Sequence, residues 1–262
     1  MQIVFFQRNF RRLFLCCLTC LLVGSLAACA GAPEPTVSSS QQPAASTHST
    51  QPPSTVPTEA STVSTTQPPA PDRSAWNLRL VNPWNYLPED FEITLTYLSN
   101  GQAVDERCYP DLQDMMDACR AAGLSPIICS SFRTQDDQEY LYNNKINRLI
   151  AQGYSEEEAP SEAAKVVAVP GTSEHQLGLA LDIVDESYQL LNEEQEDTAV
   201  QKWLMEHSWE YGFILRYPSD KSEITGIIYE PWHYRYVGKE AAKEMKASGQ
   251  CLEEYLGDVP TK

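Results

Sequence analysis

The segment Ser173-Glu-His-Gln-Leu-Gly-Leu-Ala-Leu-Asp-Ile-Val184 passes from a polar half to an apolar half. Residues 179–184 have the length and the apolar character of a buried strand. Asp182 is the only charged residue in that strand, between Leu181 and Ile183. A carboxylate in such surroundings is costly unless it has a partner, and a metal ion is one such partner. The segment therefore predicts a buried strand that carries a candidate metal ligand.

Helix and strand signals on both sides of this segment predict an α+β fold. The spacing of apolar residues predicts helices at 109–122, 134–150, 198–211 and 239–256. Gly123 and Gly212 would end two of these helices, and Thr134 would cap the start of another. Short apolar or alternating runs predict strands at 91–97, 125–130, 213–217, 226–229 and 232–236. Helices come early and short strands gather late, so we expect a small antiparallel sheet with helices packed around it.

The chain of 262 residues is acidic, with a formal net charge of -17 at pH 7. Binding to nucleic acid requires clustered lysine and arginine, and electrostatic docking on anionic lipid requires basic charge as well. The composition therefore argues against both, and we expect no nucleic-acid partner.

The first 28 residues have the layout of an export signal. Their positive start consists of Arg8, Arg11 and Arg12. Residues 13–26 form an apolar run that is too short for a comfortable membrane span. The run ends in Leu26-Ala-Ala-Cys29, which resembles the lipobox of bacterial lipoproteins. We expect cleavage before Cys29 and lipid on its thiol, with an ordinary signal peptide or an uncleaved anchor as the alternatives.

Residues 30–73 consist almost entirely of Ser, Thr, Pro, Gln and Ala and contain no Phe, Trp or Tyr. Such a segment buries too little apolar surface to offset the loss of chain entropy, so we expect an extended tether. His48 lies in it and is not expected to bind metal. Aromatic residues return at Trp76. The predicted organisation is a leader at 1–28, the lipidated cysteine and tether at 29–73, and one folded domain at 74–262.

Four cysteines remain after the leader and the predicted lipid site: Cys108, Cys119, Cys129 and Cys251. Outside the cell these could form two disulfides in three pairings. Cys108 and Cys119 would lie about 16 Å apart on one helix, which is too far for a bond. We therefore expect Cys119–Cys129 and Cys108–Cys251, with free, buried thiols as the alternative. These four contain no C-x-x-C pair, so a cysteine zinc site is not indicated.

Three histidines lie in the predicted domain: His175, His207 and His233. A hydrolytic zinc ion takes three nitrogen or oxygen ligands, keeps one position open for water, and works with a carboxylate that accepts the proton of that water. His175, Asp182 and His233 could supply the ligands. His207 stands in the predicted helix at 198–211 and is expected to be a packing or hydrogen-bonding residue.

Glu230 is the candidate for the proton-accepting carboxylate. It stands three residues before His233 in Glu230-Pro-Trp-His-Tyr-Arg235. In a straight extended segment the two side chains would project from opposite sides, but Pro231 favours a bend that could bring them together.

Three blocks of the domain resemble the motifs of a known family. They are S-x-R followed by Gln at 131–138, S-x-H-x-x-G-x-A-x-D at 173–182, and E-x-W-H at 230–233. These blocks span residues 125–238, and they resemble, in the same order, the motifs of the VanY-type D-alanyl-D-alanine carboxypeptidases, which share a fold with the Hedgehog signalling domain. Gly178, within the second block, would allow a close approach of the backbone.

The resemblance implies a role for each matching residue. His175, Asp182 and His233 would bind one Zn2+ ion. Glu230 would act as general base and then as proton donor to the leaving amine, and Arg133 would stabilise the developing oxyanion or hold the substrate. The other matches are expected to contact the peptide or line the cleft: Ser131, Gln138, Ser173 and Trp232.

The resulting hypothesis is a zinc-dependent D,D-carboxypeptidase that removes the terminal D-Ala from the pentapeptide stems of peptidoglycan. We expect a monomer, held by lipid on the extracellular face of the bacterial cytoplasmic membrane and reaching into the cell wall. An LD-carboxypeptidase or an endopeptidase of the same fold is the nearest alternative. A catalytically silent wall-binding lipoprotein is less favoured, because Glu230 is present.

Overall fold

The segment predicted to be a buried strand lies inside the main sheet. The computed structural model describes residues 71–260, and β4 is buried at all six of its positions. In sheet order the strands are β3 (Pro126–Ser130), β4 (Ala180–Asp185), β6 (His233–Tyr236) and β5 (Phe213–Leu215), each antiparallel to its neighbour. A separate antiparallel hairpin is formed by β1 (Leu95–Tyr97) and β2 (Ala103–Asp105). The predicted α+β fold with an antiparallel sheet is confirmed.

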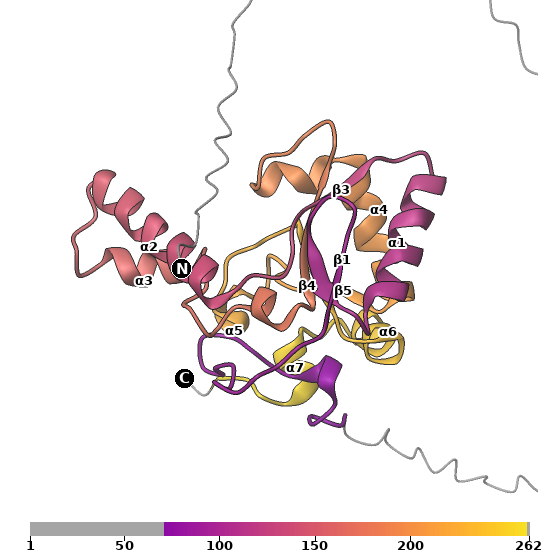
Figure 1. Cartoon of the computed structure of the whole chain (residues 1–262), viewed down its shortest axis with the longest axis horizontal. Helices are drawn as coiled ribbons and strands as arrows, with labels where there is room; N and C mark the ends of the chain where they lie inside the picture. Colours follow the sequence, from indigo (N-terminus) through magenta and orange to yellow (C-terminus); the bar gives the residue numbers. More distant parts are fainter. Residues whose placement is uncertain (1–70, 261–262) are drawn as a thin grey trace, which may run out of the picture. The chain divides into compact units, whose positions relative to one another are not determined.

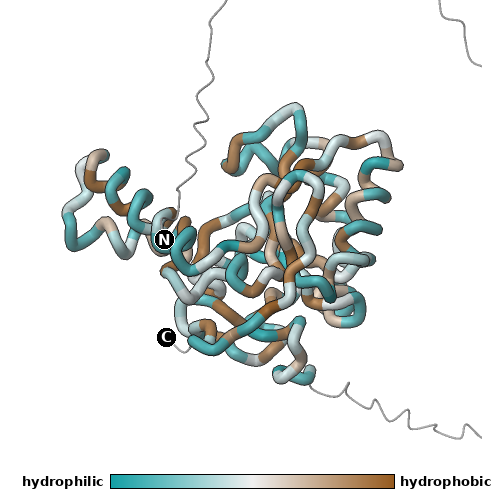
Figure 2. The backbone as a smooth tube through the Cα atoms, in the orientation of Figure 1, coloured by the Kyte–Doolittle hydropathy of each residue, from teal (hydrophilic) through white to brown (hydrophobic). Residues whose placement is uncertain are grey.

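The alternation of side chains gives this sheet one apolar face and one polar face. The apolar face includes Leu181, Ile183, Tyr234 and Tyr236. Asp182 and His233 alternate with these residues and lie on the other face. Helices α1 (Tyr109–Ala121) and α4 (Ala199–His207) cover the apolar face and lie on one side of the strands in Figure 1. Figure 2 shows hydrophobic residues along the central strands, whereas the outer helices alternate between hydrophobic and hydrophilic residues.

The other helices are short or project from the sheet. α2 (Gln135–Ala151) begins after Thr134, whose side chain accepts from the backbone N–H of Asp137, so the predicted cap is confirmed. α2 pairs with α3 (Ala159–Ala164) around a small apolar cluster of their own, and this pair projects from the sheet in Figure 1. The remaining elements are α5 (Ser222–Thr225), α6 (Lys239–Ser248), α7 (Leu252–Leu256) and the 3-10 turns η1 (Trp76–Leu78), η2 (Glu174–Leu177), η3 (Glu193–Asp197) and η4 (Ser208–Tyr211).

Two predicted elements are wrong, and a glycine with positive φ is involved in each. The predicted strand at 226–229 is a loop that starts at Gly226 (φ 76°), and Ile228 donates to the carbonyl of Lys165 instead of joining a ladder. The predicted helix at 239–256 is divided into α6 and α7, because Gly249 adopts φ 70°. Two further elements are shorter in the structure than predicted. The helix predicted at 198–211 ends with α4 and continues only as the 3-10 turn η4, and of the strand predicted at 91–97 only β1 forms.

The predicted disulfides are wrong, because all four cysteines of residues 71–260 are free thiols. Cys119 lies in the main core, whereas Cys129 is exposed, since Ile128 takes the core-facing position on β3. Cys108 is also in the main core, and Cys251 stands at the start of α7, where its backbone N–H donates to Glu254 at 2.9 Å. The alternative of free thiols holds, although Cys129 is not buried.

Residues 1–70 and 261–262 lie outside the described part of the chain. The predicted leader, the lipid site Cys29, the tether and His48 therefore stay predictions, as does the domain boundary at residue 74. Within residues 71–260, no helix combines the length and the apolar character that crossing a membrane requires.

Replacing Gly178 with Ala is expected to lower the free energy of unfolding by about 2–5 kcal/mol. Gly178 has φ 68°, and an added Cβ would collide with the side chain of Ile93 and lie 3.0 Å from the backbone nitrogen of Asp105. The strain of left-handed backbone is thus added to a tight contact with the backbone of Asp105, which can move less freely than the Ile93 side chain. Denaturant titration of the purified variant measures this loss.

Gly123→Ala is the matched control. Gly123 has φ 82°, but no atom lies within 4 Å of the added Cβ. The free energy of unfolding of this variant should fall only by the strain of left-handed backbone, about 1–2 kcal/mol. Equal losses in the two variants would contradict a close approach at Gly178.

Candidate metal centre and catalytic cleft

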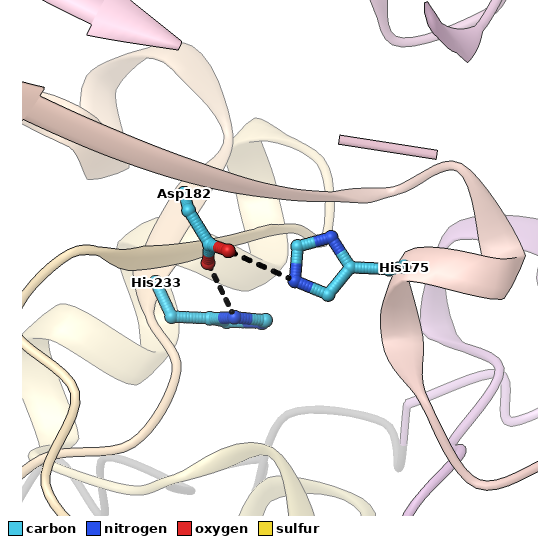
Figure 3. Close-up of side chains that lie close together, drawn as sticks. All are labelled: His175, Asp182 and His233. Carbon is cyan, nitrogen blue, oxygen red and sulfur yellow. Dashed lines mark hydrogen bonds and ion pairs between the residues drawn. The ribbon is translucent and has the colours of Figure 1, made fainter. Parts of the chain in front are cut away.

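Two of the predicted metal ligands face each other across neighbouring strands. Asp182 on β4 and His233 on β6 are register partners, so their side chains point to the same face of the sheet. His175 comes from η2, the turn that precedes β4. Figure 3 shows the two imidazoles approaching the carboxylate from different directions. All three side chains are buried, and their ligand atoms lie within 4.8 Å of one another.

The spacing of these atoms fits zinc. His175 Nε2 lies 3.4 Å from Asp182 Oδ2, and His233 Nδ1 lies 3.1 Å from Asp182 Oδ1. Ligand atoms held about 2.0–2.1 Å from a tetrahedral zinc ion are about 3.3 Å apart. Two imidazole nitrogens and one carboxylate are also a donor set that catalytic zinc sites use, with a position left for water or substrate. The structure therefore brings the three predicted ligands together in a geometry that suits this ion.

A backbone carbonyl fixes the orientation of His175. A carbonyl can only accept, so His175 Nδ1–H donates to the oxygen of Ser131 at 2.7 Å and leaves the Nε2 lone pair toward Asp182. Burial and the positive charge of Arg133 lower the pKa of His175 to about 4. The ring is therefore neutral at physiological pH, which is the form that binds a metal.

The predicted bend before His233 is confirmed. The backbone N–H of His233 donates to the carbonyl of Glu230 at 3.1 Å, which closes a four-residue turn with Pro231 at its second position. The turn brings Glu230 Oε2 to 3.7 Å from His233 Nδ1. Burial raises the pKa of Glu230 to about 8 against the opposing charges of His233 and Arg133. A cation bound beside Glu230 would lower this pKa and free the carboxylate to accept a proton.

Arg133 is held beside the ligands by three side chains. Its Nη2 donates to Ser130 Oγ at 2.9 Å and to Asp182 Oδ2 at 3.3 Å, and its Nη1 donates to Gln138 Oε1 at 3.1 Å. Gln138 is itself buried and donates to the carbonyl of Ala168 at 2.7 Å. The guanidinium is therefore fixed in the wall of the cleft, where its charge could stabilise a developing anion.

The predicted substrate contacts divide into two groups. Ser173 and Trp232 line the cleft. Ser131 and Gln138 are buried and use their side chains within the protein: Ser131 Oγ accepts from the backbone N–H of Ala103 at 2.9 Å, and Gln138 holds Arg133. The geometry supports a structural role for Ser131 and Gln138 rather than the predicted contact with substrate.

The candidate centre lies in a cleft of about 740 Å³. The apolar residues of its walls come from α2, from the segment after α3 and from two loops: Leu141, Val166, Val167, Leu191, Ile227 and Ile228. Tyr217, which sequence reasoning missed, also lines the cleft, and its ring centroid lies 4.8 Å from that of His233. Its position just after β5, the strand that pairs with β6, is the sequence signal that could have identified it.

His207, predicted to be a packing or hydrogen-bonding residue, takes no part in this centre. It ends α4 and its Nδ1 lies 2.8 Å from Glu210 Oε1. Its ring packs against Trp203 with centroids 4.9 Å apart, which confirms the packing role.

Comparison with known proteins agrees with this geometry. Residues 101–239 match the family model for VanY, D-alanyl-D-alanine carboxypeptidase. A D-alanyl-D-alanine carboxypeptidase of Enterococcus faecalis is 49% identical over 185 residues, which cover 71% of this chain and 67% of that relative.

Two solved structures are similar as well. A zinc(II) complex of a mutant vancomycin resistance D,D-pentapeptidase VanY, from a VanB-type cassette, has a TM-score of 0.64 and 48% identity over 70% of this chain and 99% of that chain. The LD-carboxypeptidase LdcB has a TM-score of 0.56 and 36% identity over 69% of this chain and 86% of that chain. The VanY match extends over more than half of the sequence and includes every residue of the candidate centre. This chain belongs to the VanY family of D-alanyl-D-alanine carboxypeptidases.

Proposed function

We propose that this protein is a zinc-dependent D-alanyl-D-alanine carboxypeptidase that removes the C-terminal D-Ala from the pentapeptide stems of peptidoglycan. The observation that carries the proposal is the convergence of His175, Asp182 and His233 in a cleft, with Glu230 beside them. The zinc(II) complex of the VanY relative supports the metal, and the 49% identity to a D-alanyl-D-alanine carboxypeptidase supports the substrate.

Each charged group of the cleft has a place in the hydrolysis. When bound, zinc supplies a Lewis acid for the scissile carbonyl and for water. Glu230 takes a proton from the attacking water, whose oxygen bonds to the carbonyl carbon of the penultimate D-Ala. When the C–N bond breaks, Glu230 returns that proton to the amine of the departing D-Ala. Arg133 offers a fixed positive charge to the scissile carbonyl oxygen, which is negatively charged after the water has added and before the C–N bond breaks.

We also propose that Cys29 is lipidated and that residues 30–73 tether the domain on the extracellular face of the membrane. The support is the arginine-rich start, the apolar run and the lipobox-like Leu26-Ala-Ala-Cys29. A tethered enzyme could reach stem peptides in the wall.

We further propose a monomer, because the whole candidate centre comes from one chain. A molar mass of a stable dimer, measured by light scattering, would contradict this.

The purified protein should remove one D-Ala from a synthetic stem pentapeptide, as measured by mass spectrometry of the peptide. A zinc chelator should abolish the release and added zinc should restore it, because the ligands act through the ion. Cleavage of a tetrapeptide alone would move the function to an LD-carboxypeptidase, and cleavage of cross-linked stems alone would move it to an endopeptidase. A zinc-loaded protein that cleaves none of them would favour a silent binding role.

Glu230→Gln should retain zinc and lower kcat by about 10²–10⁴-fold, the range for a lost general acid and base. The variant keeps the size of the side chain but cannot accept the proton. Steady-state kinetics and metal content measured on the same sample separate the two effects. His233→Ala is the contrasting control, expected to lose the zinc itself. A Glu230→Gln enzyme with nearly unchanged kcat would exclude Glu230 as the base.

Cells that express the full chain and are fed an alkyne-tagged fatty acid should label this protein, because the mature N-terminal cysteine would be acylated. Gel fluorescence after click chemistry measures the label. Cys29→Ala should abolish it, whereas Cys20→Ala should leave it intact. Equal labelling of the wild type and Cys29→Ala would rule out the proposed lipid site.

A further inference from the structure

A buried ion network lies directly behind the candidate metal centre. Its two carboxylates and two guanidiniums have fully buried side chains: Glu174, Arg216, Arg235 and Glu253. Arg216 donates to both oxygens of Glu253, at 2.9 Å and 2.6 Å. Arg235 donates to Glu174 and to the backbone carbonyls of Asn77 and Arg79. The formal charges cancel within the network, as burial requires.

Glu174 uses its two oxygens in different ways. Oε1 accepts from Arg216 Nε at 2.8 Å and from Arg235 Nη1 at 2.7 Å. Oε2 has no hydrogen-bond partner among the described residues, and it lies 3.6 Å from His233 Nε2, which also has none there. A buried polar atom left unpaired is destabilising, so two such atoms that face each other require an explanation.

The chemistry of a metal-bound imidazole explains this arrangement. A neutral ring that gives the lone pair of Nδ1 to a metal must carry its proton on Nε2. That buried N–H then requires an acceptor, and Glu174 Oε2 is the atom it faces. The plane of the ring is supported as well: Tyr217 packs against His233 with centroids 4.8 Å apart, and the Arg216 guanidinium lies 4.8 Å from the Tyr217 ring centre.

We propose that Glu174 is a positioning residue of the metal centre: Oε2 accepts the Nε2–H of His233 and selects the tautomer whose Nδ1 faces the zinc. Arg216 and Arg235 fix the carboxylate through Oε1, and Glu253 of α7 balances the second positive charge of the network without contact to Glu174. This inference rests on the proposed zinc enzyme and assigns a residue that supports it.

Zinc affinity, measured by competition with a chromophoric chelator, tests the proposal without using catalysis. In Glu174→Gln, the two arginines require the amide oxygen at the Oε1 position, so the NH2 group turns toward His233 and a donor faces a donor. We expect zinc binding to weaken by about 10–100-fold, the range for outer partners of a histidine ligand. Glu253→Gln is the matched control, because it removes one carboxylate charge from the same network without contact to His233. Its zinc affinity should stay close to that of the wild type.

Equal weakening in both variants would assign the effect to the network in general and overturn the proposal, as would an unchanged affinity in Glu174→Gln. Because the loss of a buried charge can prevent folding, ¹⁵N NMR of the zinc-loaded wild type provides a second test. His233 should show the metal on Nδ1 and a hydrogen-bonded proton on Nε2; a metal on Nε2 would overturn the proposal. A folded wild type that binds no zinc would instead overturn the proposed function on which this inference rests.

Discussion

The antiparallel pairing of β4 with β6 is the constraint on which the rest of the structure depends, because it places Asp182 opposite His233. Alternation along both strands sends their neighbours to the other face, where α1 and α4 cover them. One pairing thus specifies the hydrophobic core and the polar centre together. A register shift of one residue in β4 would turn Asp182 into the core and Leu181 toward the cleft, so the fold and the site cannot vary independently.

Charge is costly in the buried candidate metal centre, and the pKa values of its two histidines shift in opposite directions. Burial and the charge of Arg133 lower the pKa of His175 to about 4. Burial also opposes charge on His233, but the hydrogen bond to Asp182 and the nearby carboxylates of Glu174 and Glu230 outweigh it and raise the pKa of His233 to about 9. At neutral pH this shift favours the positively charged form of His233 in the metal-free centre, where the ring lies between the carboxylates of Asp182 and Glu174. A zinc ion held by His175, Asp182 and His233 would take the place of that positive charge, so the buried Asp182 carboxylate would have a partner in both states.

Local sequence signals predicted most of the scaffold, because caps and alternation are properties of neighbouring residues. Thr134 begins α2 and Gly123 follows α1, as expected. The failures are segments whose form depends on tertiary contacts. Residues 226–229 resemble a strand because Ile227 and Ile228 are apolar, yet both line the cleft. The disulfide prediction failed for the same reason: Cys119 lies in the main core, whereas Cys129 is exposed on β3.

Some motif residues of the site line the cleft, whereas others hold a neighbouring side chain in place, and residue identity alone does not separate the two groups. Arg133 lines the cleft, and its role follows from its charge. Ser131 and Gln138 belong to the same block, yet one orients His175 through its carbonyl and the other holds Arg133. Every residue has a backbone carbonyl, so the residue type does not reveal that this one orients a histidine. Glu174 has partners on β6 and just after β5, and no spacing rule connects these positions. The ligands of such a centre can therefore be found from sequence, whereas the groups that orient them become visible only when the chain has folded.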